Sequence, residues 1–219
     1  MKTYEKELPQ GYVEAKVVDA KSKKVGIIFS LIALVVTVAT LVITWFALFG
    51  QYDESFWEIG EKYLVLENPF ANIARLAILI VAIPLYIILH ELVHGIVYKL
   101  LTRQKLKFGL TFTVAYCGVP DIYVYRTTAL LSLLAPFIVF LPVFIVPMFF
   151  LKNNLDIFLF AVMLGQHVGG CVGDLYDTAL YTFKFRSPDT LMRDTGPKQT
   201  FYVKQSSEVL MTEYDGENI

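Results

Sequence analysis

Long apolar blocks separated by short polar segments are the most regular feature of this chain. A membrane-spanning helix needs about 20 consecutive apolar residues. Four segments meet that requirement, namely Val25–Phe49, Leu76–Tyr98, Thr127–Leu151 and Ile157–Phe183. The pattern therefore predicts an all-α integral membrane protein with four transmembrane helices.

Composition points the same way. The chain is 56% hydrophobic and 18% charged, whereas soluble domains are about half apolar and about a quarter charged. Its net charge of −1 lacks the basic excess that is typical of nucleic-acid-binding proteins. We expect a multi-pass protein of the cell membrane that contacts the lipid bilayer and no nucleic acid.

The distribution of basic residues predicts the orientation of the helices. Lysine and arginine concentrate in cytoplasmic loops. They precede the first apolar block, separate the second from the third and follow the fourth, as Lys21, Lys23, Lys24, Lys99, Arg103, Lys105, Lys107, Arg126, Lys184 and Arg186. The loop 50–75 is acidic instead. Both termini should be cytoplasmic, which divides the chain into an N-terminal segment 1–24, a membrane domain 25–183 with the metal site, and a tail 184–219.

The predicted cytoplasmic loop also has a strand pattern. Apolar side chains alternate from Leu106 to Tyr116, turn residues follow at 117–121, and Ile122–Tyr125 is again rich in strand-forming residues. Alternation with a central turn favours a small β-hairpin between the second and third spans. The polar tail contains one further turn signal, at 194–197, and is expected to be partly ordered at best.

The second apolar block contains His90-Glu91-Leu92-Val93-His94, which includes two of the three histidines in the chain. On a helix, residues four apart lie on one face, so both imidazoles can reach one metal ion. Zinc lowers the pKa of bound water to ~7, and the adjacent Glu91 is placed to act on that water as general base. Ionisable side chains inside a span are costly and usually functional. This motif predicts a zinc site formed by His90 and His94.

Catalytic zinc usually takes a third protein ligand, and the fourth block supplies the candidates. At ~1.5 Å per residue, His90 and Asp174 both lie roughly 15 Å from the cytoplasmic ends of their helices. By the same count Asp177 lies roughly 10 Å deep and His167 roughly 25 Å deep. Asp174 is therefore the predicted third ligand, and Asp177 and His167 remain alternatives. His167 and Cys171 share the helical face of Asp174 and could support the ligands.

Glycines give the fourth block one face without bulky side chains, which we call its thin face. They are Gly165, Gly169, Gly170 and Gly173. Small residues allow helices in lipid to approach closely. We expect this face to pack on the second block.

These motifs resemble a known family. The His90–His94 motif in a span, a basic loop with a hairpin, Ala135-Pro136, and Gly173-Asp174-Leu175 are similar to those of bacterial membrane proteins described as putative zincin peptidases, which are in turn similar to site-2 intramembrane metalloproteases. The resemblance covers about Leu76 to Phe183. It implies zinc on His90, His94 and Asp174, with Glu91 as catalytic base and the centre toward the cytoplasmic side. Site-2 proteases usually have Asp-Gly where this chain has Gly173-Asp174.

The leading functional hypothesis is a membrane-embedded zinc metallopeptidase. Zinc-bound water, activated by Glu91, would cleave a membrane protein or a membrane-held peptide. The alternative is a non-catalytic metal-binding membrane protein, such as a transporter subunit or an inactive protease homologue. That alternative requires His90 and His94 but not Glu91. The third hypothesis is a zinc hydrolase that acts on a non-peptide bond.

Overall fold

The computed structural model describes residues 2–49, 69–111, 115–151 and 154–205. The chain forms two compact units. Unit 1 comprises Met1–Gly26, His94–Leu133 and Asp177–Ile219, and unit 2 comprises Ile27–Val93 and Leu134–Tyr176. Unit 1 contains the strands, and unit 2 is helical.

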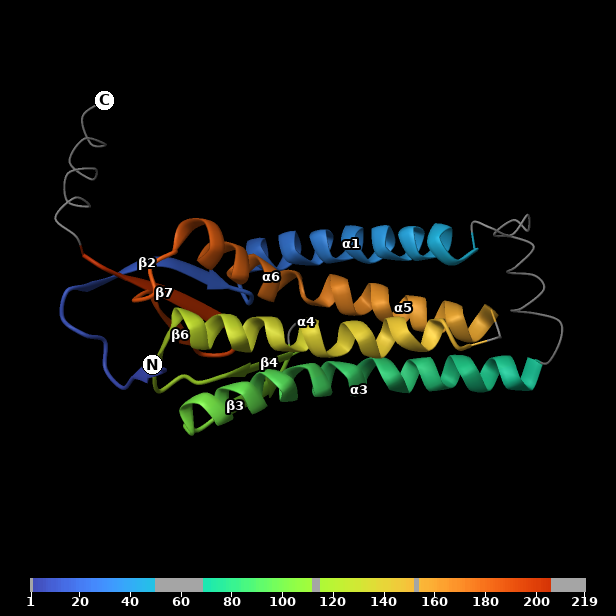
Figure 1. Ribbon diagram of the computed structural model, residues 1–219, viewed down its shortest axis with the longest axis horizontal. Coiled ribbons are helices and arrows are strands. Elements are labelled where there is room, and N and C mark those ends of the chain that lie inside the picture. The colour runs from blue at the N-terminus through green and yellow to red at the C-terminus, as the bar shows by residue number, and fades with distance from the viewer. Residues whose placement is uncertain (1, 50–68, 112–114, 152–153, 206–219) are drawn as a thin grey trace, which may run out of the picture. The chain divides into compact units, whose positions relative to one another are not determined.

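The helices follow the apolar blocks. They are α1 (Lys23–Phe49), α3 (Pro69–Thr102), α4 (Arg126–Met148), α5 (Asn154–Gly170), α6 (Val172–Ala179) and the π-helix η2 (Leu180–Lys184). Three helices, α1, α3 and α4, each contain a segment that is long and apolar enough to cross a membrane. The segments Leu155–Gly170 and Val172–Lys184 pass that test only as a pair, which is bent by 40° at the break between them (Figure 1). By length and composition this is a membrane protein.

Five strands of unit 1 form one antiparallel sheet, in the order β1-β5-β6-β7-β2. Their bounds are β1 Tyr4–Glu5, β2 Tyr12–Asp19, β5 Tyr123–Tyr125, β6 Leu191–Asp194 and β7 Lys198–Lys204 (Figure 1). The sheet thus combines the N-terminal segment, the loop after α3 and the C-terminal tail. The strands β3 (Lys107–Leu110) and β4 (Ala115–Gly118) form a separate two-stranded sheet.

The prediction of an all-α, four-span fold is wrong. The described residues contain three candidate spans together with a five-stranded and a two-stranded antiparallel sheet. The strands were missed because their partners lie far away in the sequence: Tyr4 pairs with Val124, and Tyr12 pairs with Lys204. A short, half-buried strand looks like a polar loop until its partner is known.

The expected hairpin is present with different strands. Phe108 pairs with Cys117, so the connection lies before β4 and not at 117–121, and Tyr123–Tyr125 joins the larger sheet. The predicted turn at 194–197 is confirmed, because it connects β6 to β7. There Gly196 has a φ of +98°, a conformation that glycine adopts without strain.

The thin face of α5 packs on α1, contrary to the expectation that it packs on the helix of the histidine motif. A Cβ at Gly169 would meet the main chain of Ala33 at 2.7 Å and would also clash with Thr37. The Thr37 hydroxyl donates a hydrogen bond to the Gly165 carbonyl at 3.1 Å. The glycines therefore allow main-chain contact between α5 and α1, which leaves other side chains of α5 to meet α3.

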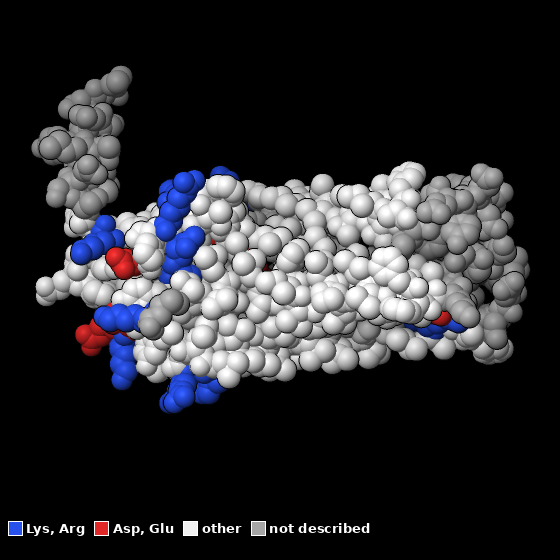
Figure 2. Space-filling view, in the orientation of Figure 1, with Lys and Arg blue, Asp and Glu red and all other residues white. Residues whose placement is uncertain are grey.

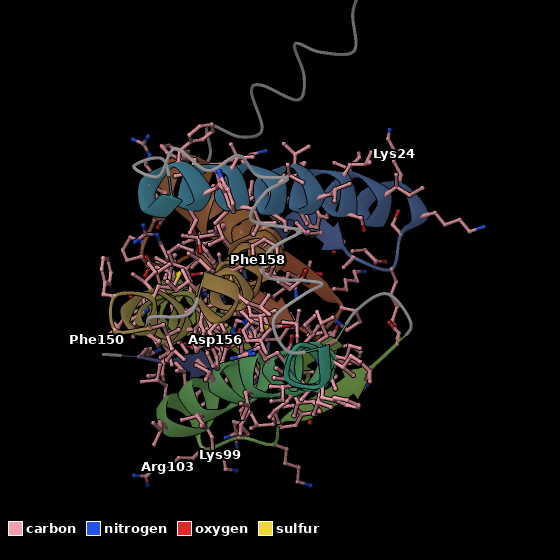
Figure 3. All side chains as sticks on the ribbon, turned by 90° about the vertical axis from the view of Figure 1, so that its right-hand side faces the viewer. Lys24, Lys99, Arg103, Phe150, Asp156 and Phe158 are labelled. Atoms are coloured by element: carbon pink, nitrogen blue, oxygen red, sulfur yellow. The ribbon has the colours of Figure 1, made fainter. Side chains whose placement is uncertain are left out.

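Charge is distributed unevenly over the surface. On the face shown in Figure 2, lysine and arginine side chains gather over part of the molecule, and the apolar helices are nearly free of charge. An exception in unit 2 is the ion pair between Arg75 Nε and Asp156 Oδ1, at 2.8 Å. Lys24, Lys99 and Arg103 point away from the chain around them, as is usual for basic residues at the ends of membrane helices (Figure 3).

Candidate metal centre

The histidine motif lies on α3, which is unbroken from Pro69 to Thr102 despite Pro84. His90 and His94 therefore lie one turn apart on one face of this helix. Both are buried, with 7% and 6% of their surface exposed. Glu91, between them in sequence, is half-buried. The local geometry that the motif requires is present.

Asp174 lies beside His90 within unit 2. Its Oδ2 is 3.2 Å from His90 Nε2. Asp174 is in the first turn of α6, directly after the break that follows α5. Gly170 and Gly173 flank this break, and glycine is a poor helix former. The broken helix thus brings Asp174 to His90, as predicted from their equal depths along the two helices. The role of Asp174 as a ligand stays a prediction.

Tyr86 connects His90 to His167. Its hydroxyl oxygen lies 3.1 Å from His90 Nδ1 and 2.7 Å from His167 Nδ1. Tyr86 is one turn before His90 on α3, and His167 comes from α5. The other nitrogen of His167, Nε2, is 3.3 Å from the Phe137 carbonyl oxygen. The Tyr86 hydroxyl therefore links His90 and His167, and the other nitrogen of His90 faces Asp174.

Aromatic rings hold these side chains in place. The Tyr86 ring packs edge-on against Phe140 and Phe144, and the His167 ring stacks on Phe137 at an interplanar angle of 27°. His167 is fully buried. The three phenylalanines all belong to α4. The surroundings exclude water, so each polar atom of these side chains needs a partner from the protein.

His94, in unit 1, has a main-chain partner. Its Nδ1 lies 2.8 Å from the Ser132 carbonyl oxygen. In a regular helix this carbonyl would accept a hydrogen bond from residue 136, but that residue is Pro136, which has no N–H. The proline thus leaves an acceptor available at Ser132. A metal-bound histidine usually donates its second N–H to such an acceptor.

The other candidates take different positions. His167 and Cys171 form with His90 a group whose ligand atoms lie within 4.8 Å of one another. Both nitrogens of His167, however, already have partners in Tyr86 and Phe137. His90 and Asp174, with His94 one turn further along the same helix, are a second group that could hold a metal ion. Asp177 is buried and belongs to unit 1, whereas Asp174 belongs to unit 2.

The second group fits zinc better by the chemistry of its donors. Two imidazoles and one carboxylate are a common ligand set of catalytic zinc, which keeps a further position open for water. Cys171 would have to lose its proton in buried, apolar surroundings before it could bind a metal.

Sequence reasoning missed Tyr86 and Ser132. Tyr86 could have been found from its spacing, because it lies four residues before His90 and so on the same helical face. Pro136 was part of the motif pattern, but its effect on Ser132 requires knowing which helix faces His94. Only the tertiary structure supplies that information.

Tyr98, one turn after His94, ends in a buried polar cluster of unit 1. Its hydroxyl donates to Asp194 Oδ2 at 2.8 Å, and the Gly196 N–H donates to Asp194 Oδ1 at 2.8 Å. Burial raises the pKa of Asp194 to about 6, although these hydrogen bonds oppose the rise. The cluster fixes the C-terminal part of α3 to the β6–β7 turn.

Comparison with known proteins gives a match to one family model. Neither a curated protein nor a solved structure matches the chain. Both metal-ligand groups and the Pro136 segment lie within residues 83–187. Residues 83–187 match the model of the family described as “Putative zincin peptidase”, so the predicted resemblance to zincin peptidases is confirmed over this segment. The predicted similarity to site-2 proteases stays a prediction.

Proposed function

We propose that this protein is a membrane-embedded zinc metallopeptidase that cleaves membrane proteins or membrane-held peptides. The observation that carries the proposal is the pairing of His90 Nε2 with Asp174 Oδ2 at 3.2 Å, on a helix that continues to His94. The family match supports a peptidase of the zincin class. The three apolar helices support a location in the membrane.

His90, His94 and Asp174 would hold the zinc ion. When bound, zinc polarises a peptide carbonyl and makes water more acidic. Glu91 is the general base: its carboxylate takes a proton from the attacking water and later gives that proton to the amine nitrogen as the C–N bond breaks. Phe137, which stacks on His167, helps to keep bulk water out of this region.

We further propose that the sheet-bearing segments are cytoplasmic. The N-terminal segment, the loop after α3 and the tail contribute strands to one sheet, so they must share one side of the membrane. These segments and the helix ends next to them carry Lys99, Arg103 and Lys184, and basic segments are retained in the cytoplasm. Single cysteines at Ser22 and Ser206, in a variant without Cys117 and Cys171, should resist an impermeant thiol reagent in intact cells. Labelling at either position would contradict this orientation.

The function is tested with Glu91→Gln in the purified full-length protein. Zinc content and thermal stability should stay at wild-type values, because Glu91 is not assigned to the metal. Cleavage of fluorescent single-span peptides in detergent, followed by mass spectrometry, should fall by about 100-fold or more. Undiminished cleavage in this variant would refute the role of Glu91. Zinc binding without cleavage by the wild type on any peptide would favour the non-catalytic alternative.

A further inference from the structure

We propose that Tyr86 and His167 are positioning residues that fix the tautomer of His90, so that its Nε2 presents a lone pair toward Asp174. The hydrogen bonds would run in one direction, from His90 Nδ1–H to Tyr86, from the Tyr86 hydroxyl to His167, and from His167 Nε2–H to the main chain. The inference rests on the zinc site of the proposed function and explains how a buried histidine is prepared for a metal ion.

The hydrogen bond between His167 and the main chain determines the direction of the whole series. Its Nε2 lies 3.3 Å from the carbonyl oxygen of Phe137, and a carbonyl can only accept a hydrogen bond. Nε2 must therefore carry the proton. His167 is fully buried among aromatic rings, where a charged imidazolium without a paired anion is costly. A neutral ring with its proton on Nε2 has an acceptor at Nδ1.

The Tyr86 hydroxyl then determines which group donates in its hydrogen bond with His90. It has one proton, and the shorter of its contacts with the two histidines, 2.7 Å, is to the Nδ1 acceptor of His167. With its proton committed there, the oxygen can only accept from His90 Nδ1, at 3.1 Å. His90 thus carries its proton on Nδ1.

The remaining nitrogen of His90, Nε2, then carries no proton. Nε2 and the Asp174 carboxylate oxygen, 3.2 Å apart, are two acceptors that face each other, an arrangement that a cation between them stabilises. His94 reaches the same tautomer by a different route, because its Nδ1 has the Ser132 carbonyl as acceptor. Both imidazoles of α3 would therefore have an Nε2 without a proton, as a metal ligand requires.

The alternative is that His167 is itself a metal ligand, in the group with His90 and Cys171. That arrangement requires a bare nitrogen on His167 directed at the ion. Nδ1 already accepts from Tyr86, and Cys171 Sγ approaches the same nitrogen at 3.7 Å. We call the hydrogen bonds from His90 through Tyr86 to His167 the relay. The relay and the ligand hypothesis predict different proton positions and different responses to substitution, so experiments can distinguish them.

The first experiment reads the tautomers directly. The chain has 3 histidines, so the ¹⁵N spectrum of histidine-labelled, metal-free protein can be assigned with one glutamine variant for each. The relay predicts protons on Nδ1 of His90 and of His94 and on Nε2 of His167. Tyr86→Phe should give His90 a mixture of tautomers and leave His94 unchanged. A proton on Nε2 of His90 in the wild type would overturn the proposal, whether or not the protein binds zinc.

The second experiment measures zinc affinity by competition with a chromophoric chelator. Tyr86→Phe should weaken zinc binding by about 10- to 100-fold, the usual effect of losing a partner of a metal-bound histidine. His167→Leu should weaken it similarly, and His167→Gln should restore it, because the glutamine oxygen can accept from Tyr86 but replaces no imidazole ligand. Failure of His167→Gln to restore affinity would support His167 as a ligand and overturn the relay.

Tyr98→Phe is the matched control. It removes a buried hydroxyl from the same helix, but this hydroxyl donates to Asp194 and not to a histidine. Its zinc affinity should stay within about threefold of the wild type. Equal losses in Tyr86→Phe and Tyr98→Phe would show that loss of packing in α3 is responsible, and the relay would be rejected. Absence of zinc from the wild type itself would instead refute the proposed function.

Discussion

His90 and His94 are identical residues one turn apart on α3, yet their surroundings differ in kind. In unit 2, the partner of His90 Nδ1 is a side chain, Tyr86, whose own orientation depends on His167. In unit 1, the partner of His94 Nδ1 is a main-chain carbonyl, that of Ser132. The first arrangement needs three compatible side chains, and the second needs only a proline four residues later.

This difference has a consequence for tolerance to substitution. A main-chain acceptor exists whatever side chain residue 132 carries, so the surroundings of His94 should respond little to changes there. The surroundings of His90 are a network in which each member satisfies the next, and a partly satisfied buried network is costly. We therefore expect side-chain changes to act mainly through His90 and backbone changes mainly through His94.

The largest effect is expected from the histidines themselves. His90→Ala and His94→Ala should each lower zinc affinity by more than about 100-fold, since a ligand is lost outright. Metal analysis of the purified variants tests this. If one of them keeps wild-type affinity, the two residues are not equivalent ligands and the comparison fails.

A similarly large effect should separate the two aspartates. Asp174→Ala should remove most bound zinc, because its carboxylate faces His90 at 3.2 Å. Asp177→Ala removes the same group from the next turn of α6, where no metal-binding group of the described residues includes it, and should keep zinc within about threefold. Full zinc in Asp174→Ala together with loss in Asp177→Ala would mean that the third ligand was assigned to the wrong turn.

Pro136→Ala should give an intermediate effect. The alanine regains an N–H that can donate to the Ser132 carbonyl and compete with His94, so zinc affinity should fall by about tenfold. Thermal stability should stay equal or rise, because a proline inside a helix removes a hydrogen bond. Opposite signs for affinity and stability distinguish this mechanism from general damage.

Two controls sharpen that test. Pro142→Ala changes another proline of α4 and restores a donor for the carbonyl of residue 138, so zinc affinity should not change. Ser132→Ala leaves the carbonyl in place and removes only a long hydrogen bond, in which the Ser132 hydroxyl donates to the His94 carbonyl at 3.4 Å, so it should change zinc affinity by less than about twofold. A loss in Ser132→Ala as large as that in Tyr86→Phe would remove the contrast between the two histidines.

The smallest effect concerns the cluster that anchors the part of α3 carrying His94. Since burial raises the pKa of Asp194 to about 6, above 3.8, its contribution to stability is complete at low pH and is lost as pH rises through about 6. The loss should be about 3 kcal/mol. Thermal melts between pH 4 and pH 7 should show this decline, and Asp194→Asn should reduce it. An equally steep decline in the asparagine variant would assign it to another group.

The sequence by itself determined the apolar helices, the histidine motif and the resemblance to zincin peptidases. Length and apolarity suffice for a helix in lipid, where every backbone polar group must be satisfied within the segment. The spacing of His90, Glu91 and His94 is likewise local, because a helix fixes which side chains share a face. The rise per residue likewise predicted that Asp174 lies near His90, and it does. Its choice over His167 as the third ligand stays a prediction.

Only the tertiary structure decided the sheet and the partners of the histidines. A strand such as Tyr4–Glu5 has no identity until Tyr123 and Val124 are beside it, since its hydrogen bonds are all to distant residues. In the same way, Tyr86 is one more aromatic residue in an apolar helix until His167 and the rings of α4 surround it. Helices are encoded by neighbours in sequence, whereas strand pairing and the proton arrangement around a buried ligand depend on contacts that the linear pattern does not contain.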